Sequence, residues 1–246
     1  MKVAIFCNTR TASKLVLNRL AVLLKLKSLS EPFTNFLEPS KPFDINYCEA
    51  MREKIYNSED CISKIVSFNY EISFDSLNFI DYSRFDKVVI LNRRNLTDVI
   101  CSIYAGIYIR NRNYEDDIID CDDYIIPANE VLIWYVAHQI RFIKVSSIIK
   151  KQSDYLEIFY EDLKNEPAVR KQFLSSFEDL LVESNRQVEF YHRIENPLYS
   201  WRESNIKNRC LNYFEVEEAL QKAQDSQSLN YLELKDIIYS SMGITE

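Results

Sequence analysis

A short polar loop near the N-terminus has the composition of an anion-binding site. The segment CNTRTASK places Arg10, Thr11, Ser13 and Lys14 after an apolar stretch and at the start of a helix-forming run. The free N–H groups and the positive dipole end of a helix N-terminus bind phosphate and similar anions. The segment therefore indicates a phosphate or sulfate site, with a simple helix cap at Thr11 or Ser13 as the alternative.

A second group of polar residues follows an apolar stretch in the middle of the chain. In RRNLTDVICS, the residues Arg94, Asp98 and Ser102 are spaced four apart and would line one face of a helix. Asp98 in the first turn favours the helix dipole, whereas Arg94 and Ser102 offer a cation and a hydroxyl to one anion. The spacing predicts a second anion-binding position.

These two polar segments need a scaffold that brings them to one edge of the molecule. The period of the apolar residues predicts a strand at Val3–Cys7, a helix from Ala12 to about Lys27 and a short strand around Leu29–Glu31. A right-handed crossover makes the two strands parallel. The first polar loop and Glu31 would then both emerge at the carboxyl edge of the sheet.

The alternation of strand and helix continues along the chain. The further predicted elements are a strand at Lys87–Leu91, a helix from Leu96 to about Ile109, a long helix from about Pro127 to Ile149, a strand ending at Tyr160, and a helix with Pro167 in its first turn. The segment Cys61–Phe68 fits either a strand or a helix. The pattern predicts an α/β fold in three layers, with a central, mainly parallel sheet flanked by helices.

The composition limits the class of protein. Of the 246 residues, 47% are hydrophobic and 27% are charged, and no Pro-, Gly- or Ser-rich stretch divides them, so a single domain over residues 1–246 is expected. The net charge of −7 disfavours a nucleic-acid partner. Six cysteines without a C-x-x-C pair predict reduced, mostly buried thiols and no metal site. Without a signal peptide or a spanning segment, a cytoplasmic protein with no membrane anchor is expected.

The first loop also excludes one kind of nucleotide chemistry. A nucleoside triphosphatase would carry G-x-x-x-x-G-K-[ST] at this place. The two glycines of the chain, Gly106 and Gly243, both lie far from the loop. Walker-type hydrolysis is therefore not expected.

Three segments in this order resemble the signatures of sulfotransferases that use 3′-phosphoadenosine-5′-phosphosulfate (PAPS) as donor. They are CNTRTASK after the first strand, VVILNRRNLTDVICSIY in the middle, and FYEDLKNEP later, and the resemblance extends from Met1 to about Leu181. It implies a P-loop-like nucleotide-binding architecture. It also implies transfer of a sulfuryl group to a hydroxyl or amine, with PAPS as co-substrate and no metal.

Carried over position by position, the resemblance implies a role for several residues. The first loop would cradle the 5′-phosphosulfate with the residues Arg10, Thr11, Ala12, Ser13 and Lys14. Arg94 and Ser102 would hold the 3′-phosphate, and Tyr160 would contact the adenosine. The chain departs from the family where Ala12 replaces the usual Gly and Leu96 the common Pro.

Two further roles have weaker signatures. The loop that covers the nucleotide is assigned to LYSWRESNIK, with Ser200 and Trp201 as candidates because an aromatic ring can stack on adenine; a simply packed Trp201 is the alternative. Glu31 is the candidate catalytic base beside Arg10, which would stabilise the charge that develops on the leaving oxygen. An exposed loop position for Glu31 is the alternative.

Three functions are compatible with these residues. The first is a PAPS-dependent sulfotransferase acting on a small-molecule or glycan acceptor. The second is a kinase that uses a nucleoside triphosphate and Mg²⁺, and the third is a nucleotide-binding module without turnover.

The acidic run Tyr114–Tyr124 is expected to be a solvated loop, with a contact to a cationic substrate as the alternative. The sequence leaves acceptor identity and oligomeric state open.

Overall fold

The computed structural model describes residues 1–8, 11, 13–29, 32–33, 45–67, 79–110, 123–182 and 206–225. The chain divides into two units, each made of two segments. The first unit takes Met1–Arg94 and Phe142–Arg202, and the second takes Asn95–Arg141 and Glu203–Glu246. The single domain expected over residues 1–246 stays a prediction.

A sheet of five parallel strands forms the centre of the first unit, in the order β2-β3-β1-β4-β5. The strands are β1 (Lys2–Cys7), β2 (Lys27–Ser28), β3 (Cys61–Val66), β4 (Lys87–Asn92) and β5 (Tyr155–Phe159). The three central strands are nearly continuous runs of buried residues, as expected of a parallel sheet covered on both faces. The predicted α/β fold is confirmed, and the segment that fitted either a strand or a helix is β3.

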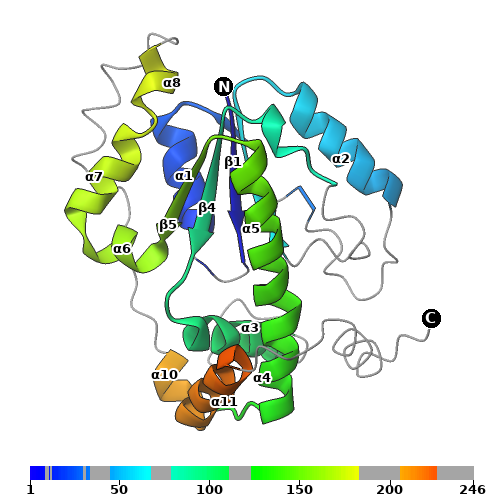
Figure 1. Ribbon diagram of the computed structural model, residues 1–246, viewed down its shortest axis with the longest axis vertical. Helices are drawn as coiled ribbons and strands as arrows, with labels where there is room; N and C mark the ends of the chain where they lie inside the picture. The colour runs from blue at the N-terminus through cyan, green and yellow to red at the C-terminus, as the bar shows by residue number, and fades with distance from the viewer. Residues whose placement is uncertain are drawn as a thin grey trace. The chain divides into compact units, whose positions relative to one another are not determined.

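Helices cover both faces of this sheet (Figure 1). One face carries α1 (Ser13–Leu23), α6 (Tyr160–Asn165), α7 (Pro167–Ser175) and α8 (Glu178–Val182), and the other carries α2 (Ile45–Asn57), η4 (Tyr82–Arg84) and α5 (Arg141–Gln152) from Phe142 onward. Successive residues of β1 alternate between the two cores, because neighbouring side chains of a strand point to opposite faces. The predicted three layers are confirmed.

The first helix ends earlier than predicted. Lys25 has a φ of 54°, and the N–H groups of Lys25 and Leu26 donate to the carbonyls of Val22 (3.4 Å) and Ala21 (2.9 Å). These two bonds form a Schellman motif, which ends a helix with one left-handed residue. As a result, β2 begins at Lys27, inside the segment predicted to be helical.

The second unit consists mainly of helices. They are α3 (Leu96–Arg110), α4 (Ala128–Trp134), the π-helical segment η5 (Tyr135–Ile140), α10 (Ile206–Arg209) and α11 (Tyr213–Asp225). Their core includes Cys101, Val131 and Val216. An isolated parallel bridge joins Tyr124 to Cys210. The long helix predicted to begin near Pro127 is present as three consecutive helical segments, α4, η5 and α5.

The cysteines in the described part of the chain are buried thiols that form no disulfide, as predicted: Cys7, Cys48, Cys61, Cys101 and Cys210. Within the described ranges, no helix combines the length and the apolar composition that crossing a membrane requires.

Candidate functional site

The loop after β1 places hydroxyl groups at the start of α1. Thr11 and Ser13 are buried, whereas Lys14 is exposed. The Thr11 hydroxyl donates to the carbonyl of Asn8 (2.8 Å), and the Asn8 side chain accepts a hydrogen bond from the Ser67 hydroxyl at the end of β3. These bonds link Thr11, Asn8 and Ser67 at the carboxyl edge of the sheet, where β1 and β3 end.

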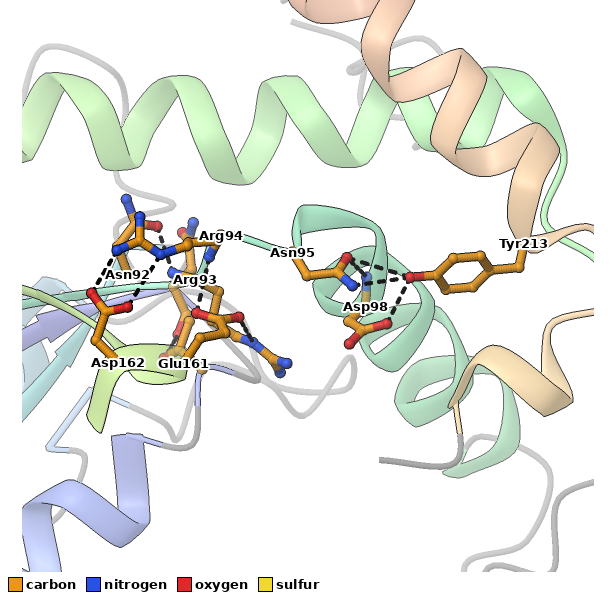
Figure 2. A network of polar contacts seen from close by, with 10 residues as sticks. Asn92, Arg93, Arg94, Asn95, Asp98, Glu161, Asp162 and Tyr213 are labelled. Atoms are coloured by element: carbon orange, nitrogen blue, oxygen red, sulfur yellow. Dashed lines mark hydrogen bonds and ion pairs between the residues drawn. The ribbon is translucent and has the colours of Figure 1, made fainter. Parts of the chain in front are cut away.

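Two arginines follow β4 directly. The Arg94 side chain is 56% exposed, and its Nε and Nη2 atoms donate to the two carboxylate oxygens of Asp162 at 3.3 and 2.6 Å (Figure 2). The guanidinium group also lies over the Phe159 ring, 4.1 Å from the ring centre. Arg94 is therefore held by a bidentate ion pair with Asp162 and by a cation–π contact with Phe159.

Glu161 joins the two arginines. Its carboxylate accepts from the Nε of Arg93 (3.2 Å) and from the backbone N–H of Arg94 (3.1 Å), and the Arg93 guanidinium lies 5.0 Å from the centre of the Tyr160 ring. Register explains these contacts: β4 and β5 are parallel neighbours with Asn92 opposite Phe159, so the residues after each strand emerge side by side.

Polar side chains also organise the first turn of α3. The Asn95 side chain accepts from the backbone N–H of Asp98 (3.0 Å), which is the geometry of a helix N-cap. The buried Tyr213 hydroxyl donates to the Asp98 carboxylate (2.9 Å) and accepts from the Asn95 amide (3.1 Å), as Figure 2 shows. Burial raises the pKa of Tyr213 above its ordinary value.

The predicted shared helix face is corrected in one respect. Because Asn95 caps the helix and α3 begins at Leu96, Arg94 precedes the helix and does not lie on its surface with Asp98 and Ser102. Arg94 is the last residue of this segment of the first unit, whereas Ser102 is a buried residue of the second unit. Their joint role on one phosphate stays a prediction.

Tyr160 differs in position from the sequence expectation. It is the first residue of α6 and not the last residue of β5. The residue is buried in the core of the first unit and burial raises the pKa of its hydroxyl. Its contact with adenosine stays a prediction.

Other predicted site residues lie outside the described residues. They are Arg10, Ala12, Glu31, Ser200 and Trp201. Of the acidic run, only Asp123 and Tyr124 are described. The roles of the five site residues outside the described ranges are therefore predictions from the sequence.

Sequence reasoning missed the polar partners of the candidate site. Glu161 and Asp162 have no predicted role of their own within the FYEDLKNEP segment, although each contacts an arginine. The available signal was two adjacent acidic residues after one predicted strand and two adjacent arginines after another. The Asn8 contact with Ser67 had no such signal, because it depends on β3 lying beside β1.

Comparisons with known proteins give no family model and low similarity to solved structures. No protein-family model matches the chain, and no curated protein matches it. The structure is similar to the YorR protein from Bacillus subtilis in complex with phosphorylated GDP, at 14% identity and a TM-score of 0.43, over 73% of this chain and 98% of that one. It is also similar to the mouse sulfotransferase SULT7A1 complexed with PAP, at 11% identity and a TM-score of 0.45, over 97% of this chain and 88% of that one.

Proposed function

We propose that the chain is a sulfotransferase that moves a sulfuryl group from PAPS to a hydroxyl or amine of a small-molecule or glycan acceptor. The supporting observation is that the carboxyl ends of the neighbouring strands β1 and β4 carry the loop with Thr11 and Ser13 and the side chain of Arg94. Ligands of parallel α/β sheets bind at the carboxyl ends of the strands. Hydroxyl, helix N-terminal and guanidinium donors at this edge suit a doubly anionic nucleotide.

In this proposal the nucleotide is held at two ends. The loop after β1 cradles the 5′-phosphosulfate, and Arg94 with Ser102 holds the 3′-phosphate. The adenosine is contacted by Tyr160, Ser200 and Trp201. These assignments follow from the sequence resemblance, position by position.

The proposed reaction is an in-line displacement at sulfur. A bond forms between the acceptor atom and sulfur while the bond from sulfur to the bridging oxygen breaks, and that electron pair stays on the leaving 3′-phosphoadenosine-5′-phosphate (PAP). The acceptor proton goes to a base, for which Glu31 is the candidate. Arg10 stabilises the charge that grows on the bridging oxygen, which lowers the barrier because this charge is larger in the transition state.

Binding of PAP to an Arg94→Ala variant tests the proposal. Removing a charge-assisted pair should weaken binding by about 1.5 to 3 kcal/mol, measured by titration calorimetry at fixed salt. Arg84→Ala is a matched control, because Arg84 is 57% exposed, pairs with Asp81 at 3.6 Å and lies over the Tyr56 ring at 4.7 Å. Equal affinities in the wild type and Arg94→Ala would contradict the proposal.

A second measurement separates the sulfotransferase from the two alternative functions. The protein is incubated with radiolabelled PAPS and a mixed panel of acceptors, and transfer of label supports the proposed reaction. Binding of PAP without transfer to any acceptor favours a non-catalytic module. A gain in ATP affinity that depends on Mg²⁺ favours a kinase.

A further inference from the structure

Asp162 binds one edge of the Arg94 guanidinium, and we propose that it is a positioning residue that directs the opposite edge toward the phosphate of the nucleotide. The proposal rests on the proposed function, because it assigns the part of the site that would hold the 3′-phosphate. It adds Asp162, from helix α6 after β5, to the residues proposed to hold that phosphate.

The hydrogen-bonding capacity of Arg94 supports this role. A guanidinium group has five N–H donors in one plane, and Asp162 accepts from two of them, on Nε and Nη2. The edge formed by Nη1 and the other Nη2 hydrogen is a second fork that matches a phosphate or a carboxylate. Arg94 is 56% exposed and Asp162 20%, so the arginine is the more accessible member of the pair.

Two further contacts limit how Arg94 can move. Phe159 lies under the guanidinium at 4.1 Å and sets its plane, and Glu161 accepts from the Arg94 backbone N–H at 3.1 Å and holds the main chain. An arginine without such contacts must lose side-chain freedom when it binds a ligand. Asp162 fixes the direction of the Arg94 guanidinium group within its plane. It therefore reduces the loss of side-chain entropy that binding of the ligand would otherwise cause.

The charge of Asp162 allows positioning to be separated from simple electrostatics. Arg93 and Arg94 are matched by Glu161 and Asp162, so the charges of the four side chains cancel. Removing the Asp162 carboxylate leaves an excess positive charge, which by Coulomb's law alone would strengthen the binding of an anion. A positioning role predicts the opposite change, a weaker binding of the anion, because Arg94 loses its orientation when Asp162 is removed.

The test compares two nucleotides in three variants. Asp162→Ala should weaken the binding of PAP about three- to tenfold in calorimetry at fixed salt, and it should leave the binding of 5′-AMP, which lacks the 3′-phosphate, unchanged. Glu157→Ala is the matched control: it also removes a carboxylate from an ion pair, 2.7 Å from Lys150, and it should change neither affinity. In Arg94→Ala, a further Asp162→Ala change should cost nothing more, since Asp162 acts through Arg94.

The possible results separate this inference from the proposed function. Tighter or unchanged PAP binding in Asp162→Ala overturns the positioning role, while a loss in Arg94→Ala alone still supports the proposed function. Equal losses for PAP and 5′-AMP overturn it as well, because they indicate a general structural effect. A wild-type protein that does not bind PAP overturns both.

Discussion

Replacing Tyr213 by Phe should loosen the first turn of α3. The Tyr213 hydroxyl is buried, donates to the Asp98 carboxylate at 2.9 Å and accepts from the Asn95 amide at 3.1 Å. Phenylalanine keeps the ring and removes only this hydroxyl. The variant therefore removes only the two polar contacts of this hydroxyl, which join the start of α11 to the start of α3.

The expected loss in the free energy of unfolding is about 1 to 2 kcal/mol. A hydrogen bond to a charged group contributes about 1.5 to 3 kcal/mol. The expected value lies around the lower end of that range and partly below it, because Asp98 is only partly buried and water can replace the hydroxyl at its carboxylate. With an m-value of about 2 kcal/mol/M, the urea midpoint should fall by about 0.5 to 1 M.

The fluorescence of Trp134 provides an assay specific for the second unit. The chain has two tryptophans, so a Trp201→Phe background leaves Trp134 as the reporter, and Trp134 packs against the core of this unit. Tyr155→Phe serves as the control in the same background, because Tyr155 is 39% exposed and its change should stay within about 0.5 kcal/mol.

Two results would refute this reasoning. The first is an unchanged urea midpoint for Tyr213→Phe. The second is that Tyr213→Phe lowers the free energy of unfolding by the same amount in the Asp98→Asn background as in the wild type. The effect of removing the hydroxyl should be smaller in that background, because the charged acceptor of its hydrogen bond is gone.

Two further predictions concern stability. Lys25→Gly should raise the free energy of unfolding by about 0.5 to 1 kcal/mol, because a φ of 54° is strained for any residue with a Cβ atom; Lys25→Ala should not, and equal melting temperatures for both variants would contradict the reasoning. Burial raises the pKa of Tyr124 and Tyr213, so their contribution to stability is complete below the unfolded pKa of about 10 and is lost as the pH rises through the folded pKa. Circular dichroism with tyrosinate absorbance should show unfolding at high pH that Tyr213→Phe reduces; ionisation of all tyrosines near pH 10 without unfolding would argue against it.

The sequence predicted those elements that have a strong local pattern. Strands β1 and β4 are unbroken apolar runs followed by polar loops, so both their type and their place were correct. The end of α1 was missed because Lys25 occupies the left-handed position where glycine is the usual signal. The π-helical segment η5 was also not predicted, since nothing in its sequence distinguishes it from the α-helices on either side.

The candidate site was predicted only in the part that depends on residue type. Arg94 and the loop after β1 were found because cations and hydroxyls after a strand are a local pattern. The partners of Arg94 were not found, since the contact with Asp162 depends on the register of β5 against β4. Such a contact joins residues far apart in the sequence and leaves no local periodicity.

In the proposed site, the register of β5 also determines how the anion is attracted to the end of β4. The charges of Arg93 and Arg94 are cancelled by Glu161 and Asp162, so the cluster has little long-range field in a chain whose net charge is −7. Attraction must then come from N–H donors at short range, and their direction matters more than their charge. A shift of one residue in β5 would turn its side chains to the opposite face and remove both carboxylates from the arginines. The pairing of two strands therefore determines whether the two arginines form a directed set of donors or an unpaired positive patch.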